Sequence, residues 1–494
     1  MKLVAEKSNA FVVTPRAARL AAAALLAGLF IVAFAARARQ LLVDPYPIGV
    51  DGYYYVVQVR SLLETGQLNY PAARLGFYWL LPWAAAFGPV VGVKLGAAAG
   101  TALAVFPAYA LARRVSGSRA AALVGAALVA TSAASHFLAA EFLKQGLGLT
   151  LALAALASLA WALDRPGWAR GALAAALILA TAFTHKSSVA LVLLVGAPAA
   201  WLHLREHDPR RARQALLAAA GLVAALLLLG TLMPASFPGP RDLGLVADAF
   251  TTRAEWDLPA LALPHHRLGF GHEALLAAVL AAAALTVAWP RLPPFAIGFV
   301  ALALILAIPW LDVHDVQGAA LRLRAAAFVP LAPLAALVIA RLVRADVPRV
   351  AACAALAAAA LLVRPLAPSD GQSHTHPALV AAVRALDGVV PPGASVVTQD
   401  RKIAFMARWY ARQPMQLHPV ASAYRLMPGY WITAELRQAL TELRATPPSG
   451  VALPRDLHPA DENGLVLLPE ATFEYLMTRV SPAARAHYHT WPTT

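Results

Sequence analysis

Long apolar runs recur along the chain, and they restrict its fold more than any other feature. Several of them reach the roughly 20 residues that a helix needs to cross a bilayer, beginning with the run at 18–37. Of the 494 residues, 60% are hydrophobic and 14% are charged, whereas soluble domains average about 25% charged residues. Backbone polar groups in lipid must be satisfied within the segment itself, so such runs fold as helices. The sequence therefore predicts a polytopic α-helical membrane protein.

Hydropathy predicts about eleven membrane-spanning helices. Their approximate bounds are 18–37, 90–112, 120–140, 145–163, 171–185, 188–204, 214–233, 273–289, 294–311, 320–342 and 348–366. The segment 77–88 is also apolar, but its tryptophans favour the membrane–water interface, so we expect an interfacial or re-entrant helix. The first run resembles a signal peptide, with Ala33-Phe34-Ala35 as a cleavage site, but its length and the many later spans favour an uncleaved span.

Basic residues gather in alternate short connections between the predicted spans. With the N-terminus in the cytoplasm, every short cytoplasmic connection is basic, as the positive-inside rule requires. The residues are Lys2, Lys7, Arg16 and Arg19, then Arg113, Arg114, Arg119, Arg165, Arg170, Arg205, Arg210, Arg211, Arg213, Arg291, Arg341, Arg344 and Arg349. Counting 77–88 as a span would invert every later connection. We expect a bacterial-type inner or plasma membrane, with the C-terminal segment outside the cytoplasm.

Several classes of function are disfavoured. Much of the net charge of +15 lies in those short connections, so it does not indicate nucleic acid. The single cysteine, Cys353, lies in an apolar run, so we expect neither disulfides nor a cysteine metal site. The chain has no Walker A motif, Rossmann glycine fingerprint or Gly-x-Ser-x-Gly elbow. An activated donor at the external face would therefore be carried by a lipid.

Composition divides the chain into two predicted domains. Residues 1–366 hold the spans, with external loops at 38–89 and 234–272. Residues 367–494 have an ordinary soluble composition, with helical patterns and short strand-like runs among proline-based turns. We expect this second segment to be a small α/β domain outside the membrane.

The stretch 44–70 follows the first span and opens with a loop rich in proline and glycine. Apolar residues at helical spacing predict a helix over 53–65, with Gly66 as its C-cap. Asp51 lies at the N-terminus of this helix. It either caps the helix or serves as a general base or metal ligand at the membrane surface, and the two roles are compatible. The residues that we expect beside it are Arg60, Tyr54 and Tyr55.

Two further polar pairs lie at predicted external ends of spans. Glu141 and Lys144 have a spacing that allows a local ion pair. Alternatively, Glu141 holds a metal ion or an acceptor hydroxyl and Lys144 meets a phosphate. His185 and Lys186 close the fifth span, and both can donate to phosphate oxygens. The alternative for this second pair is that the side chains only extend to the interface.

A third polar group lies at the start of the tenth predicted span. Arg322 and Arg324 either clamp a phosphate or pyrophosphate or pair with the acids that precede them in the sequence. Weaker metal signals come from Asp312, His314 and Asp315, and from His265-His266.

These positions together resemble the GT-C superfamily of integral-membrane glycosyltransferases, which includes oligosaccharyltransferase catalytic subunits, protein mannosyltransferases and lipid A aminoarabinose transferases. The likeness consists of a first span with an acidic external loop, a second acidic loop, a Thr-His pair, and a late arginine-bearing span before an external domain. The matching residues are Gly49-Val50-Asp51-Gly52-Tyr53-Tyr54-Tyr55 with Arg60, Glu141-Phe142-Leu143-Lys144-Gln145-Gly146, Thr184-His185 and Arg322/Arg324.

The resemblance implies transfer of a sugar from a polyprenyl-phosphate or polyprenyl-diphosphate donor to a lipid, glycan or protein acceptor, with Asp51 as base. The implied donor-phosphate ligands are Lys144, His185, Lys186, Arg322 and Arg324, and the implied acceptor-side residues are Glu141, Arg60, Tyr54 and Tyr55. The chain departs from the metal-dependent oligosaccharyltransferases, because Glu141 lacks a paired Asp-x-Asp and no Trp-Trp-Asp-Tyr-Gly motif is found. A bacterial envelope-sugar transferase with a monosaccharide donor and no metal fits better. If a divalent ion (Mg or Mn) is used, Asp51 and Glu141 would hold it.

Two other classes stay open. Polytopic chains of this size are often transporters or lipid flippases, which keep polar residues near the midplane and often have broken helices. A non-catalytic protein of envelope-polysaccharide assembly would keep the fold without the chemistry. The gathering of polar residues at one face of the predicted bundle favours the enzyme.

Overall fold

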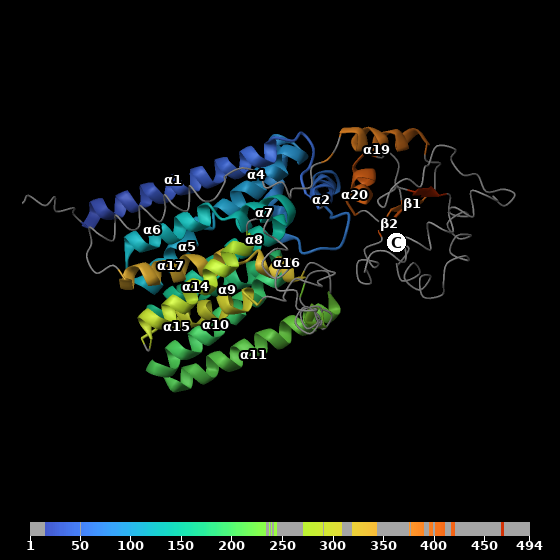
Figure 1. The fold of residues 1–494 in the computed structure, drawn as a ribbon. Helices are drawn as coiled ribbons and strands as arrows, with labels where there is room; N and C mark the ends of the chain where they lie inside the picture. The colour runs from blue at the N-terminus through green and yellow to red at the C-terminus, as the bar shows by residue number, and fades with distance from the viewer. Residues whose placement is uncertain are drawn as a thin grey trace, which may run out of the picture.

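The computed structural model describes residues 15–49, 51–233, 237, 239, 242–244, 270–289, 291–308, 319–342, 375, 377–389, 395–398, 401–410, 416–419 and 466–468. These residues are mostly helical, and most of the helices form one elongated bundle (Figure 1). The predicted span at 348–366 and the candidate metal residues at 265–266 and 312–315 lie outside the described residues.

The bundle is built from the helices of the first 342 residues. In chain order these are α1 Pro15–Leu42, α2 Gly52–Thr65, α3 Leu75–Phe87, α4 Pro89–Ala102, α5 Val105–Ser116, α6 Arg119–Ala130, α7 Ala133–Glu141, α8 Leu143–Asp164, α9 Trp168–Thr184, α10 Lys186–His207, α11 Pro209–Leu232, α14 Phe270–Ala288, α15 Pro294–Leu306, α16 Ala319–Arg324 and α17 Phe328–Leu342.

Six of the described helical stretches are long and apolar enough to cross a membrane, or seven if the bent pair α6 and α7 counts as one span. This makes the chain a membrane protein, as predicted. The helices α9, α14 and α15 are apolar but shorter. The prediction of eleven spans is thus only partly confirmed.

Several predicted spans are interrupted helices. The span predicted at 90–112 consists of α4 and α5, and the one at 120–140 consists of α6 and α7, which are bent by 41°. The span predicted at 320–342 is divided into α16 and α17. The helix predicted over 53–65 is confirmed as α2, and Gly66 caps it in the left-handed region at φ 73°. These breaks are important because they bring polar side chains to helix ends inside an apolar bundle.

The core consists largely of small and branched apolar side chains, as the alanine-rich sequence suggests. One cluster joins α5, α6, α8, α10, α14, α15 and α17, with Phe299 and Phe328 among its fully buried members. A second cluster joins the end of α1 with α2, α3 and α4, and it extends into the C-terminal helices. The candidate site lies at this second cluster.

The described part of the C-terminal segment contains two helices and three short strands. The helices are α19 Pro377–Val389 and α20 Arg401–Tyr410, and the strands are β1 Ser395–Thr398, β2 Gln416–Pro419 and β3 Val466–Leu468. The strand order is β2-β1-β3; β1 pairs parallel with β2 and antiparallel with β3. Figure 1 shows α20 beside α2, at the end of the bundle where α1 ends. This arrangement brings the C-terminal segment to the loop that carries Asp51.

Candidate functional site

Asp51 lies at the N-cap position of α2, but its side chain makes no capping hydrogen bond. Only 6% of the residue is exposed. The backbone of the preceding loop makes the turn instead, since the Gly52 N–H donates to the Gly49 carbonyl at 3.4 Å. The capping interaction that local sequence allowed is therefore not formed, and the carboxylate lies buried at the mouth of α2.

Tyr55 connects Asp51 to the other end of the site. Its hydroxyl accepts a hydrogen bond from the backbone N–H of Lys144, at the start of α8. Burial, and then the nearby Asp51 carboxylate, raise the pKa of Tyr55, while Arg322 acts in the opposite direction. Tyr55 is therefore a neutral donor near Asp51, and Asp51, Lys144 and Arg322 all lie close to it.

Glu141, the last residue of α7, lies against the Asp51 loop. Gly49 has φ +90°, and a Cβ there would lie 2.5 Å from the Ala140 carbonyl oxygen and 2.9 Å from Glu141 Oε2. Only glycine allows this approach without strain. Glu141 is 5% exposed. Glu141 thus lies against the same short loop that carries Asp51.

Lys144 lies in the first turn of α8 and points toward aromatic rings of α2 and α3. Its Nζ lies 4.8 Å from the Phe77 ring centroid and 6.0 Å from that of Tyr54. The helix is interrupted at Phe142, between α7 and α8. Glu141 and Lys144 therefore do not share one continuous helix, and the helical spacing on which a local ion pair was predicted is absent.

Arg322 approaches the same break from α16. Its Cζ lies 4.6 Å from the Phe142 ring centroid, and its backbone carbonyl accepts a 2.6 Å hydrogen bond from Gln145 Nε2. Two buried atoms here, Arg322 Nε and Gln145 Oε1, have no hydrogen-bond partner among the described residues. Arg322 also takes part in none of the ion pairs found in that part of the chain.

His185 joins α9 to α10 and lies close to α8. A Cβ on Gly148 would lie 2.8 Å from His185 Cβ, so the glycine allows this close approach. The His185 ring bonds through Nδ1 to Ser187 Oγ at 2.8 Å. The positive charges of Arg322, Lys144 and Lys186 act on the imidazole. The residues Lys144, His185 and Arg322, which we predicted to bind the donor phosphate, thus gather at one place, although more than a hundred and seventy residues separate the first from the last.

Three predicted site residues have other partners. Lys186 forms an ion pair with Asp242 of the 234–272 loop, so a side chain that we assigned to phosphate is already neutralised. The Arg324 guanidinium donates to the Ile308 carbonyl at 2.9 Å. Arg60 does not lie beside Asp51 as predicted; it extends to α20, where it donates to backbone carbonyls. A helical pattern in the sequence does not show which neighbouring element covers each face of the helix. The sequence therefore could not show that Lys186, Arg324 and Arg60 bind other partners than the remaining predicted site residues do.

Three buried charged residues of the bundle were missed. Arg37, 0% exposed, donates to Ala33, Val129 and Ala130 carbonyls and to Ser135 Oγ. Glu273 accepts from Ser132 Oγ and from the Ala133 N–H, both at 2.7 Å. Lys94 donates to the Asp44 carbonyl. The available signal was a charge inside or at the edge of an apolar run.

Among the described residues no group of three or more His, Cys, Asp or Glu side chains could hold a metal ion. Asp51 and Glu141 are two of the carboxylates near the loop, and Asp44 is a third, whose oxygens accept from the Tyr46 and Thr375 backbone N–H groups. What the arrangement offers chemically is a buried carboxylate, Asp51, and two cations, Lys144 and Arg322, near Tyr55, with the His185 imidazole close to both cations. A comparison with protein-family models gave no match for this chain, and a comparison with curated proteins also gave none.

Proposed function

We propose that this protein is a membrane glycosyltransferase of the GT-C type, which moves a sugar from a polyprenyl-phosphate or polyprenyl-diphosphate carrier to an acceptor hydroxyl. The observation that carries the proposal is the meeting of Asp51, Lys144, His185 and Arg322 around Tyr55 and Phe142. A carboxylate near two cations and an imidazole at one end of an apolar bundle suits a lipid-borne anionic donor and a neutral nucleophile.

In the proposed reaction Asp51 accepts the proton of the acceptor hydroxyl. The acceptor oxygen then forms a bond to the anomeric carbon, and the bond from that carbon to the phosphate oxygen breaks. The leaving phosphate keeps the electron pair, and Lys144, His185 and Arg322 stabilise its developing charge. A single displacement of this kind inverts the anomeric configuration. The proton passes from Asp51 to solvent after product release.

The membrane arrangement that goes with this proposal has about eleven spans, a cytoplasmic N-terminus and an extracytoplasmic C-terminal α/β domain over 367–494. It is supported by the basic residues in alternate connections and by the mixed helices and strands of the C-terminal segment. Lys186 and Arg324 are not part of the proposed phosphate site, because Asp242 and the Ile308 carbonyl occupy them. We propose that the enzyme works without a metal ion. Asp51 and Glu141 are the residues that would hold Mg or Mn in a metal-dependent version of the reaction.

A transporter or flippase is the second candidate, and one observation favours it. The bent pair α6 and α7 forms a broken span with the buried charges Arg37 and Glu273 beside the break, a feature found at transporter ion sites. However, both terminal nitrogens of Arg37 and both carboxylate oxygens of Glu273 already bind protein atoms. This break is therefore better suited to holding helices together than to binding a transported ion.

Purified protein in liposomes, supplied with a labelled polyprenyl-phosphate sugar, separates the candidates. The transferase transfers the label to an acceptor and releases polyprenyl phosphate. A flippase moves the intact donor between leaflets without breaking the bond, and a non-catalytic assembly protein does neither. The first result is expected. Intact donor after prolonged incubation with lipid, glycan and peptide acceptors would contradict the transferase proposal, and translocation of that donor would support transport.

A further inference from the structure

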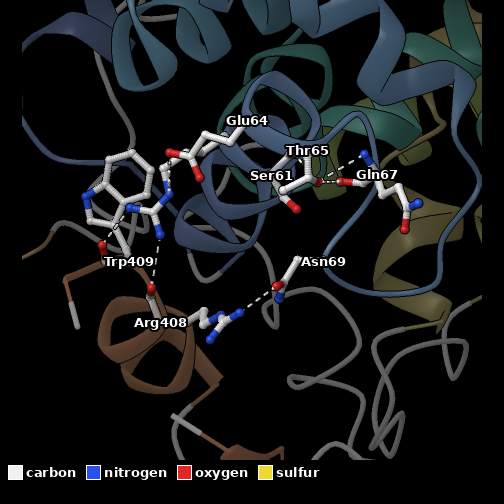
Figure 2. Close-up of polar contacts among 8 residues, drawn as sticks. Ser61, Glu64, Thr65, Gln67, Asn69, Arg408 and Trp409 are labelled. Carbon is white, nitrogen blue, oxygen red and sulfur yellow. Dashed lines mark hydrogen bonds and ion pairs between the residues drawn. The ribbon is translucent and has the colours of Figure 1, made fainter. Parts of the chain in front are cut away.

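Helix α20 ends against α2, and Arg60 joins the two. Arg60 donates from Nη1 to the Trp409 carbonyl at 2.8 Å and from Nη2 to the Arg408 carbonyl at 3.1 Å; Figure 2 draws these bonds as dashed lines that end at Trp409 and Arg408. Its guanidinium also lies 4.3 Å from the Trp409 ring centroid. The last carbonyls of a helix have no intrahelical partner and carry the negative end of its dipole. A planar cation with two parallel donors suits this end well.

Other contacts join the same surfaces. The Tyr53 and Tyr410 hydroxyls lie 3.0 Å apart, and Arg408 donates to Asn69 Oδ1 at 2.9 Å (Figure 2). Thr375 donates through its hydroxyl to the Pro47 carbonyl at 3.2 Å. The C-terminal segment is therefore held both to α2 and to the loop that carries Asp51.

This docking places one aromatic ring of α20 in the wall of the site. The Phe405 ring centroid lies 5.1 Å from that of Tyr54 and 5.5 Å from that of Tyr70. Tyr54 in turn faces Lys144 Nζ. Phe405 is 7% exposed. Aromatic rings of α2 and α3 thus face the Lys144 ammonium, and Phe405 of the C-terminal segment packs against one of them, Tyr54.

We propose that Arg60 is a positioning residue, which fixes α20 on α2 so that Phe405 completes the aromatic wall beside Lys144. The docking stands on the contacts alone, and its consequence for sugar transfer rests on the proposed function. The carbonyl bonds carry this role, because the Glu64 carboxylate lies 4.0 Å from Arg60 Nε and its side chain is 66% exposed. Such an exposed pair contributes little.

Thiol cross-linking tests the docking without any substrate. Cys353 is the single native cysteine, so Cys353→Ser with Tyr53→Cys and Tyr410→Cys gives a reporter protein with one thiol on each helix. A short bifunctional thiol reagent should join them rapidly. Adding Arg60→Gln removes both carbonyl bonds and should slow cross-linking by about fivefold or more. Arg60→Lys, which keeps the charge but not the fork, should give an intermediate rate.

Two matched variants serve as controls in the same reporter. Glu64→Gln removes the acid beside Arg60, and Arg114→Gln removes an arginine that pairs with Asp164 elsewhere in the bundle. Neither should change the rate. Each protein is first checked for a single size-exclusion peak, so that a misfolded variant is excluded. An unchanged rate in both Arg60→Gln and Arg60→Lys would overturn the proposal.

The transfer assay then separates this proposal from the proposed function. In the native-cysteine background, Arg60→Gln should raise the acceptor KM by about tenfold and change kcat less, because the wall contacts substrate without taking part in bond breaking. If the unmodified protein transfers no sugar but Arg60→Gln still slows cross-linking, the docking stands and the transferase proposal fails. If Arg60→Gln leaves KM unchanged in an active enzyme, the positioning role fails and the transferase proposal stands.

Discussion

Two helix breaks follow each other closely in the chain, and they use buried polar groups in opposite ways. The first lies between α6 and α7, where the pair bends by 41°. The second lies at Phe142, between α7 and α8. At the first break, residues from other helices supply hydrogen bonds to the chain ends. At the second, two buried polar atoms have no hydrogen-bond partner among the residues that the structure describes.

At the first break the chain ends bond to charged side chains of other helices, although Arg37 Nε itself has no hydrogen-bond partner among the described residues. Arg37 of α1 donates to the Val129 and Ala130 carbonyls at the end of α6, each at 3.2 Å. Glu273 of α14 accepts from Ser132 Oγ and the Ala133 N–H at the start of α7. Helix ends buried in an apolar bundle need such partners. These two charges therefore replace the water that would satisfy the break at a surface.

The second break is only partly satisfied by protein atoms. Gln145 gives its amide N–H to the Arg322 carbonyl, but Gln145 Oε1 and Arg322 Nε have no partner among the described residues. Ser188 Oγ, on the neighbouring α10, is also buried and has no hydrogen-bond partner among the described residues. A buried polar atom without a partner costs about 1–3 kcal/mol. Such atoms at one place indicate a site whose remaining partners come from a ligand or water.

The comparison separates charges that hold the fold from charges that are available for chemistry. The first break was invisible in the hydropathy pattern, which treats 120–140 as one continuous span. The second falls in the predicted connection between the spans 120–140 and 145–163. What distinguishes them is what the buried side chains bind. Arg37 and Glu273 bond the chain ends at the first break, whereas Gln145 Oε1 and Arg322 Nε at the second have no partner among the described residues. Substitutions at the first break should therefore affect stability, and substitutions at the second should affect activity.

The largest effect is expected at the first break. Arg37→Met removes the donors of the α6 carbonyls and leaves the buried Glu273 charge without its nearest cation, so the folded state should lose about 3–5 kcal/mol. Thermal unfolding in detergent measures it. Arg39→Met is the matched control, since Arg39 is exposed on the same helix and should stay within about 0.5 kcal/mol. Equal unfolding temperatures for both variants would contradict the structural role of this break.

Asp51→Asn should have the next largest effect, and on activity alone. An amide cannot accept the acceptor proton, so transfer should fall by about 10²–10⁴-fold. The unfolding temperature should hardly change, because the Asp51 side chain makes no capping bond. The control is Asp164→Asn, which breaks the ion pair with Arg114 and should leave transfer intact. Near-normal transfer by Asp51→Asn would remove Asp51 from the role of base.

Arg322 and Arg324 give the sharpest test within one short helix. Arg322→Gln should reduce transfer by about 10–100-fold, because a charge-assisted bond to the leaving phosphate is lost, while stability changes little. Arg324→Gln should instead lower the unfolding temperature, because it removes the bond to the Ile308 carbonyl from a residue that is 5% exposed. The two measurements are kcat/KM and thermal unfolding. Loss of stability in Arg322→Gln together with loss of transfer in Arg324→Gln would contradict the roles that we assign to these two arginines.

The sequence predicted the parts of this picture that depend on composition and local pattern. Apolar runs gave most of the helices, and Gly66 marked the end of α2 as observed. The alternation of basic connections grouped Asp51, Glu141, Lys144, His185 and Arg322 at one end of the predicted bundle, and the structure brings these residues together. Topology alone was enough for this grouping, since helix ends on one side of a membrane share one depth.

The partners of individual side chains could not be predicted in this way. Lys186 pairs with Asp242, which belongs to a loop with no helical pattern that would fix its position. Arg60 is oriented by α20, which follows it by more than three hundred residues. Arg37 looked like the end of a span, and only the bend of α6 and α7 gives it buried acceptors. Each case depends on tertiary packing that a linear pattern does not contain.

Gln145 should give the smallest effect, and it tests the second break most directly. Gln145→Leu keeps the size of the side chain but loses the 2.6 Å bond to the Arg322 carbonyl. A single net hydrogen bond is worth about 1 kcal/mol, so transfer should fall about fivefold as Arg322 loses its fixed position. The free energy of unfolding should fall by less than the value of this bond. The substitution also removes Gln145 Oε1, a buried oxygen without a partner among the described residues, and its removal is favourable.

The contrast with the first break decides what the Gln145 result means. Ser132→Ala removes the hydroxyl that donates to Glu273 Oε2 at 2.7 Å. This substitution should lower the unfolding temperature with little change in kcat/KM. Gln145→Leu should show the opposite pattern. If Gln145→Leu destabilises the protein as Ser132→Ala does and leaves transfer unchanged, the second break is a structural joint like the first. Lys144 and Arg322 would then not be assigned to a substrate phosphate, because their arrangement would serve packing alone.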